Sequence, residues 1–156
     1  MSLIKACSIS LIAAVLLAAS GCGGVSIEPV ETRTIIFKAD SEINYQQLLP
    51  IDIIYVTYLH ELRDLTSLGP NRWFNSDKRQ NWAAKKSVSI VGGQRLVVEL
   101  NSRLASRSPF IVVFATFKGV TDPAPQQVVL DSQAKQVEYI SVHSHSLEPE
   151  NVYLRD

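Results

Sequence analysis

Residues 51–59 read IDIIYVTYL, and this stretch decides the fold. It follows Pro50, has high β propensity and is apolar on both faces for most of its length. A strand of this kind needs a packed layer on each side, which predicts a central strand buried on both faces. Residues 110–117, which read FIVVFATF and end at Lys118, have the same character and predict a second such strand.

Shorter strands are predicted on either side of these two. Residues 34–39 are rich in β-branched and aromatic side chains and stop at a polar stretch. Residues 127–130 and 136–146 predict two more strands. The last of them changes its apolar phase between Tyr139 and Ile140, which indicates a bulge or a strand that crosses from one sheet to the other.

Gly92 and Gly93 separate residues 88–91 from residues 95–100. Glycine readily adopts the positive φ values that a two-residue turn needs, so the pattern predicts a β-hairpin. The pair is no phosphate-binding loop, because no lysine follows it and it lies between two strands rather than before a helix.

Residues 65–86 interrupt the strand pattern and predict one helical segment. Ser76 or Asn75 is placed to cap a short helix whose last turn carries Lys85 and Lys86, the sign of charge that the helix dipole favours there.

Trp73, Phe74 and Trp82 in this segment have two interpretations. They could form an exposed docking or sugar-stacking surface, or they could cover the core. Aromatic residues on a short helix beside a sheet usually pack inward, which favours the core for Phe74 and Trp82.

Together these patterns predict a mainly β fold, an antiparallel β-sandwich with a short helical insertion and no internal repeat. The sequence has 15 Lys and Arg against 15 Asp and Glu, and this charge balance favours neither nucleic acid nor an anionic membrane surface as a partner.

The first 24 residues have the pattern of an export signal. Lys5 precedes an apolar run from Ala6 to Ala19 that is too short to span a bilayer and ends in small residues. The end of the run resembles the bacterial lipobox, which implies that Cys22 becomes a lipid-modified N-terminus. The alternative is an ordinary secretory signal that leaves Cys22 as a free thiol. We expect a signal peptide over residues 1–21, a lipidated tether over 22–32 and a β-sandwich domain over 33–156.

Two or three acyl chains would hold the protein on a membrane almost permanently, whereas one would not. Gly23 follows the cysteine, where an aspartate would signal retention in the inner membrane in enterobacterial sorting. The expected location is therefore the outer membrane, facing the periplasm.

Candidate sites outside the anchor are few. His143 and His145 would lie on one face of a strand and could share a metal, but no ligand cluster accompanies them. No serine stands in a nucleophile-elbow motif. The sequence thus predicts neither a metal site nor a cofactor nor an enzyme.

The loop after the first strand is the best candidate for a contact surface. Residues 41–49 offer a tyrosine and adaptable hydrogen-bonding groups, a composition typical of contact loops, although a passive connector has the same composition. The candidate residues are Ser41, Glu42, Asn44, Tyr45, Gln46 and Gln47.

In this order the motifs resemble the type VI secretion lipoprotein family known as TssJ, SciN or VasD. The residues that carry the resemblance are Ala39-Asp40-Ser41, Ile43-Asn44, Pro50, Val56-Thr57-Tyr58-Leu59, Trp73-Phe74, Gly92-Gly93 and the strand from Val112 to Lys118. They span most of the mature chain.

The resemblance implies a transthyretin-like β-sandwich hung from the outer membrane as a non-enzymatic scaffold. Its partner would be the periplasmic domain of the large inner-membrane subunit, TssM, contacted through residues 41–49. The alternative function is a periplasmic lipoprotein that binds a ligand such as a carbohydrate by stacking on Trp73 and Trp82.

Overall fold

The structure, a computed structural model, describes residues 27–150. The elements in chain order are β1 (Thr34–Ala39), η1 (Asn44–Gln46), β2 (Leu49–Val56), α1 (Leu59–Phe74), α2 (Asp77–Asn81), β3 (Lys85–Ile90), β4 (Arg95–Glu99), α3 (Ser102–Ala105), β5 (Phe110–Ala115), η2 (Ala124–Gln126), β6 (Gln127–Leu130), β7 (Val137–Val142) and β8 (Leu147–Pro149).

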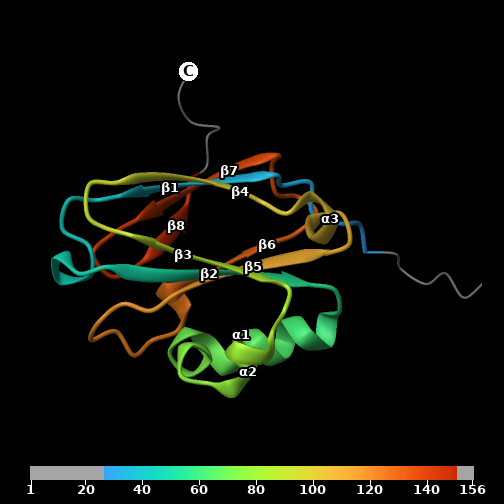
Figure 1. Cartoon of the computed structure of the whole chain (residues 1–156), viewed down its shortest axis with the longest axis horizontal. Coiled ribbons are helices and arrows are strands. Elements are labelled where there is room, and N and C mark those ends of the chain that lie inside the picture. The colour runs from blue at the N-terminus through green and yellow to red at the C-terminus, as the bar shows by residue number, and fades with distance from the viewer. Residues whose placement is uncertain (1–26, 151–156) are drawn as a thin grey trace, which may run out of the picture.

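Two four-stranded sheets pack face to face, one in the order β4-β1-β7-β8 and the other in the order β3-β2-β5-β6. Helices α1 and α2 cover the outer face of the second sheet (Figure 1). This is a β-sandwich with a helical insertion, so the predicted fold class is confirmed. None of the helices within residues 27–150 is long and apolar enough to span a membrane.

The two central strands are buried on both faces, as the sequence predicts. Ile51 and Ile53 of β2 point between the sheets and belong to the larger hydrophobic core. Ile54 of β2 and Phe114 of β5 point the other way, into a smaller core under the helices. Each strand therefore has an apolar layer on both sides, which is why neither shows an alternating pattern.

The helical layer is larger and begins earlier than predicted. β2 ends at Val56 rather than Leu59, and α1 starts at Leu59. The carboxylate of Glu61 accepts hydrogen bonds from the backbone N–H groups of Thr57 (3.2 Å) and Tyr58 (3.1 Å), which satisfies donors that the first helical turn leaves free. The β propensity of Tyr58 and Leu59 hid this helix start.

The predicted short helix is present, but its end was wrong. Ser76 caps α2, and its Oγ accepts a hydrogen bond from the backbone N–H of Arg79 (3.2 Å). The helix stops at Asn81, so Lys85 and Lys86 lie on β3 rather than in a last helical turn.

A buried carboxylate joins the helical layer to the sheet. Asp52 of β2 is fully buried and accepts hydrogen bonds from Nε1 of Trp73 (2.8 Å), Nε of Arg79 (2.6 Å) and Oγ of Ser87 (2.6 Å). Burial alone would raise the pKa of Asp52, but these hydrogen bonds and the charge of Arg79 outweigh it and lower the pKa. Asp52 therefore stays ionised and holds α1, α2, β2 and β3 together.

The predicted β-hairpin at Gly92-Gly93 is wrong. β3 pairs with β2 in one sheet, whereas β4 pairs with β1 in the other. The turn therefore carries the chain from one sheet to the other, and Gly93 does have the positive φ of 74° that the sequence suggested. A glycine turn specifies a sharp reversal, but the pairing of its flanks depends on distant strands.

The last long strand ends at Val142 rather than Ser146, and it has neither the predicted bulge nor the predicted crossing from one sheet to the other. β7 runs parallel to β1 in unbroken register from Thr34 opposite Val137 to Ala39 opposite Val142. The change of phase came from Tyr139 and Glu138. Tyr139 faces outward, and the Lys38 ammonium lies 5.2 Å from the centroid of its ring. Glu138 is buried and accepts a hydrogen bond from the backbone N–H of Lys135. This parallel pair is an exception in an otherwise antiparallel sandwich.

The N-terminal segment is fixed to the fold before β1 begins. The backbone N–H of Val30 donates to the carbonyl of Ser108 (3.0 Å), and Oγ1 of Thr32 donates to the carbonyl of Lys135 (2.8 Å). Both side chains are buried. Residues from Val30 onward, which the sequence placed in the tether, are thus part of the folded domain. The predicted signal peptide and Cys22 lie outside the described residues.

Candidate functional site

Four connections meet at one end of the sandwich, and we call this surface the loop end. It consists of residues 40–48, 91–94, 116–123 and 143–146, and it lies at the left of Figure 1. The first of these connections holds all the candidate contact residues predicted from the sequence. Hydrogen bonds join the other three connections to residues 40–48.

A short left-handed turn forms the tip of residues 40–48. Asn44, Tyr45 and Gln46 have φ values of 46°, 54° and 61°. Left-handed backbone costs a residue with a side chain about 1–2 kcal/mol, so three in succession need support from the surroundings. Backbone strain that is held in place in this way is often found at functional sites, so this turn is a candidate functional site.

Asn44 supplies that support. Its Oδ1 accepts a hydrogen bond from the backbone N–H of Lys118 (2.6 Å), and its Nδ2 donates to the carbonyl of Leu48 (3.1 Å). Its own backbone N–H donates to the carbonyl of Ser144 (3.3 Å). The side chain is only 4% exposed. Among the predicted contact residues, Asn44 is therefore a positioning residue that lies beneath the surface.

The other predicted contact residues are at the surface: Ser41, Glu42, Tyr45, Gln46 and Gln47. Tyr45 is 65% exposed, and Leu48, which the sequence did not single out, is 60% exposed. Leu48 directly precedes Leu49, which is fully buried at the start of β2. The signal that could have identified Leu48 is its position as an apolar residue at the end of the mostly polar stretch from Glu42 to Gln47.

A shallow hollow adjoins the turn. It has a volume of about 390 Å³ and is lined by Glu42, Tyr45, Gln46, Ser144 and His145. The rings of Tyr45 and His145 meet edge to face, with centroids 5.7 Å apart. The hollow gives the exposed tyrosine a polar neighbourhood with hydrogen-bonding groups of both kinds.

Gly92 lets the turn at 91–94 lie directly against residues 40–48. A Cβ atom at Gly92 would lie 2.1 Å from the carbonyl oxygen of Ser41. The backbone N–H of Gly93 donates to the carbonyl of Asp40 (2.9 Å). The loop end is therefore a packed surface rather than a set of independent loops.

His143 fixes the start of residues 40–48. Its Nδ1 lies 2.9 Å from Oδ2 of Asp40, and its Nε2 lies 3.5 Å from Oε2 of Glu148. The hydrogen bond with Asp40, with smaller contributions from the charges of Asp40 and Glu148, raises the pKa of His143. The imidazole is thus placed to act as a positive link between two carboxylates.

The sequence placed His143 and His145 on one face of a strand, where they could share a metal, but the structure does not place them there. Both residues lie in the turn after β7, where His143 contacts acidic residues and His145 contacts Tyr45. Within residues 27–150, no three His, Cys, Asp or Glu side chains gather closely enough to hold a metal ion.

The aromatic residues of the helical layer face the core. Trp73 is fully buried, and Phe74 and Trp82 are partly buried against the same small core. The favoured interpretation of Phe74 and Trp82 is therefore confirmed. Trp73 offers no open face on which a sugar could stack, since its ring meets those of Trp82 and Phe114, each 6.0 Å away.

The same fold occurs in solved structures of type VI secretion components. A chain in the structure described as "Type VI membrane complex" has a TM-score of 0.61 at 18% identity, over 78% of this chain and 98% of that one. A chain in the structure described as the TssM C-terminal domain from EAEC has 0.60 at 18%, over 77% and 98%. The lipoprotein TssJ1 from Pseudomonas aeruginosa has 0.52 at 12%, over 78% and 95%.

At these identities the comparisons establish a shared fold. In sequence, no family model matches the chain and no curated protein is significantly similar to it.

Proposed function

We propose that the protein is a lipid-anchored scaffold of a type VI secretion membrane complex. It is held on the outer membrane through Cys22, faces the periplasm, and uses the loop end to bind the periplasmic domain of a large inner-membrane subunit of the TssM kind. It acts by binding and not by catalysis. The fold shared with the lipoprotein TssJ1 and with a chain of a type VI membrane complex supports this assignment.

The observation that carries the proposal is the position of the left-handed turn relative to the N-terminus. Residues 27–33 and the start of β1 lie at one end of the sandwich, and residues 40–48 follow the other end of β1 (Figure 1). A chain anchored at Cys22 would therefore carry Tyr45 and Leu48 on the end that points away from its membrane, toward a partner rooted in the other one.

Tethering makes a modest interface sufficient. The lipid confines the domain to one membrane surface, which raises its effective concentration near a partner that reaches across the periplasm. An exposed tyrosine on a turn held by Asn44 is suited to this task, since little of its backbone freedom remains to be lost on binding. The rigid tip thus favours a protein partner over a passive connector.

The alternative of carbohydrate binding has lost its main support. It relied on Trp73 and Trp82 as stacking faces, and Trp73 is fully buried with its Nε1 bound to Asp52. The hollow beside Tyr45 is open, so a sugar bound there would remain largely exposed to water. The scaffold function explains the exposed apolar residues of the loop end better.

A photo-crosslinking experiment in the native envelope tests the proposal. A photoreactive phenylalanine replaces Tyr45 in one version of the full chain and Val97, an exposed residue in the middle of β4, in another. We expect the label at position 45 to crosslink to a large inner-membrane secretion subunit identified by mass spectrometry. The label at position 97 serves as the matched control and should give no such product.

Two substitutions complete the test. Cys22→Ser should release the protein from the membrane fraction and abolish the crosslink at position 45. Tyr45→Ala in the unlabelled chain should prevent capture of the subunit while the protein remains in the membrane. Normal assembly of the secretion complex with both variants would contradict the proposed function.

A further inference from the structure

The exposed large apolar residues of the described chain fall mainly into two groups at opposite ends of the sandwich. Tyr45, Leu48 and Val91 belong to the loop end, which the proposed function uses. Ile27 (43% exposed), Tyr58 (58%) and Leu59 (43%) lie at the other end, where residues 27–33 join the fold. The second group has no role in the proposed function.

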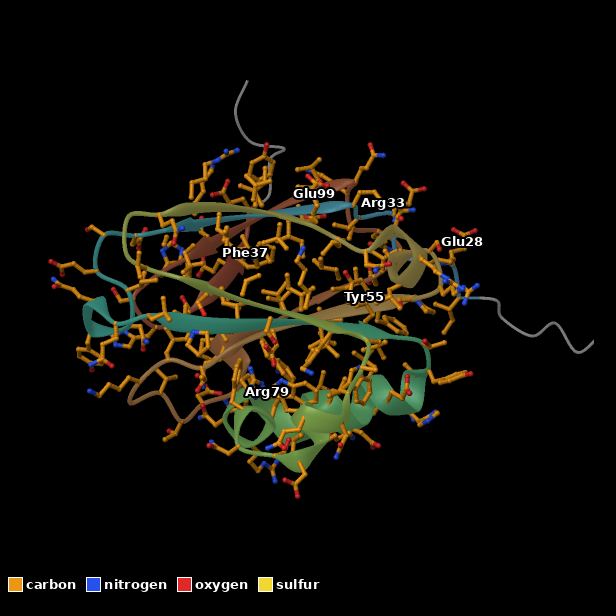
Figure 2. The ribbon with its side chains drawn as sticks, in the orientation of Figure 1. Glu28, Arg33, Phe37, Tyr55, Arg79 and Glu99 are labelled. Atoms are coloured by element: carbon orange, nitrogen blue, oxygen red, sulfur yellow. The ribbon has the colours of Figure 1, made fainter. Side chains whose placement is uncertain are left out.

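Several elements converge at this second end, which we call the N-terminal end. Residues 27–33, α3 and the first turn of α1 all lie there in Figure 1, and Glu28 is labelled there in Figure 2. The hydroxyl of Tyr55, near the end of β2, accepts a hydrogen bond from the backbone N–H of Asn101 (2.9 Å), directly before α3. This bond links the end of β2, shortly before Tyr58 and Leu59, to the start of α3.

Two arginines accompany these apolar side chains. Arg103 lies on α3 and Arg107 follows it, and both are exposed. Within residues 27–150, neither guanidinium forms an ion pair. A tyrosine, two aliphatic residues and unengaged arginines are the combination that favours the boundary between lipid headgroups and acyl chains, because guanidinium binds phosphate and the tyrosine ring is amphipathic.

The length of the tether brings this end to the membrane. Cys22 is eight residues before Val30, where the chain becomes fixed to the fold. Eight residues reach at most about 26–29 Å when fully extended, and less in any other conformation. An anchored domain therefore has its N-terminal end within a short distance of the bilayer surface at all times.

We propose that the N-terminal end of the sandwich, with Ile27, Tyr58, Leu59, Arg103 and Arg107, rests on the phospholipid headgroups of the membrane that holds the lipid anchor. This inference rests on the proposed acylation of Cys22 and adds an orientation to it. The contact turns a loosely tethered domain into one that presents the loop end at a fixed height and angle to its partner.

The charges at this end predict how the contact depends on salt. Glu28 and Glu31 are exposed on the N-terminal segment and offset Arg103 and Arg107. Net charge therefore contributes little, and the contact depends on insertion of the apolar side chains and on local pairing of arginine with phosphate. Raising the salt concentration should weaken it far less than it weakens a polybasic membrane site.

The test uses the full acylated protein in vesicles of phosphatidylethanolamine and phosphatidylglycerol. A single cysteine replaces Tyr58, Tyr45 or Val97 in turn and carries an environment-sensitive fluorophore; Cys7 is removed with the signal peptide and Cys22 is acylated, so the new thiol is the only free one. We expect the label at position 58 to shift to shorter wavelength and to lose most of its quenching by iodide. Labels at 45 and 97 should remain fully quenched.

The arginines are tested in the same system. Arg103→Gln combined with Arg107→Gln should restore most of the iodide quenching at position 58, whereas Arg95→Gln, at the start of β4 beside the loop end, should not. Protection that grows with the number of proteins per vesicle would assign the surface to a second copy of the chain and overturn the proposal.

Mass spectrometry of the same sample separates the two proposals. If the protein is acylated and position 58 is quenched as strongly as position 45, anchoring stands and the membrane contact is refuted. If the protein carries no acyl groups, the anchoring itself is refuted and the contact with it.

Discussion

Nε1 of Trp73 donates a 2.8 Å hydrogen bond to Oδ2 of Asp52, and both residues are fully buried. The bond joins α1 to β2, one of the two central strands of the second sheet. Arg79 completes the junction with its own bond to the same carboxylate oxygen at 2.6 Å. We therefore expect this junction to contribute strongly to the stability of the protein.

Asp52→Ala should destabilise the protein by about 3 kcal/mol. Removing one partner of a buried ion pair leaves the other partners unsatisfied, and the partial exposure of Arg79 places the loss at the low end of the usual range. Urea unfolding followed by circular dichroism gives the change. Lys78→Ala is the matched control, because Lys78 makes a 3.9 Å exposed ion pair with Asp64 and should change stability by less than about 1 kcal/mol. An equal loss in both variants would contradict this role for Asp52.

The same carboxylate predicts a loss of stability in acid. The pKa of Asp52 is lowered in the folded protein, so its contribution is present above the ordinary pKa of 3.8 and is lost as the pH falls through the folded value. Unfolding free energies measured from pH 6 down to pH 2 should therefore fall more steeply for the natural protein than for Asp52→Asn. Parallel curves for the two proteins would show that Asp52 is not the group responsible.

His143 predicts a dependence of the opposite sign at the loop end. Its pKa is raised by Asp40, so the link between the two residues is fully present below the ordinary pKa of 6.5 and weakens as the pH rises through the folded value. Amide hydrogen exchange at residues 40–48 should be faster at pH 8.5 than the intrinsic pH effect explains. His143→Gln should remove this extra dependence; an unchanged profile in the variant would exclude His143 as its source.

Gln46→Gly should stabilise the protein by about 0.5–1 kcal/mol. Gln46 has a φ of 61°, a conformation that costs about 1–2 kcal/mol for a residue with a side chain and nothing for glycine. Glycine also has more conformational freedom in the unfolded chain, which reduces the gain by about 0.5–1 kcal/mol. Thermal unfolding measures the net gain. Gln47→Gly is the control, since Gln47 has a φ of −95° and should only lose stability.

Gly92→Ala should disrupt the loop end. The new Cβ would lie 2.1 Å from the carbonyl oxygen of Ser41, and both the oxygen and the atoms behind it belong to backbone that cannot turn away. We expect destabilisation of more than about 2 kcal/mol together with loss of the crosslink from position 45. Gly93→Asn is the comparison, because no atom lies within 4 Å of a Cβ there and asparagine tolerates a positive φ.

The sequence predicted the features that depend on short stretches of chain. The strands at 34–39 and 127–130, the two-faced burial of residues 51–56 and 110–115, and the Ser76 cap all follow from local composition. What could not be read from the sequence depends on partners far along the chain. The flanks of Gly92-Gly93 pair with β1 and β2 rather than with each other, and no local pattern encodes that choice.

In the candidate site, too, local sequence predicted some features, whereas others depend on distant residues. The sequence located the loop from its polar composition and its tyrosine, but it could not separate Asn44, which is held under the surface by Lys118, from its exposed neighbours. The Asp52 junction was hidden because Trp73, Arg79 and Ser87 lie 21, 27 and 35 residues from it. A single aspartate in an apolar strand was the available signal, since such a residue needs buried partners.

The parallel pairing of β1 with β7 has a consequence for export. Thr34 lies opposite Val137, so in a protein exported as proposed the first strand cannot complete its sheet until β7 has left the translocation channel. Contacts of such long sequence separation form late and slowly. A protein exported as proposed would thus remain unfolded enough to cross the inner membrane, and its sandwich would close only when β7 and β8 arrive.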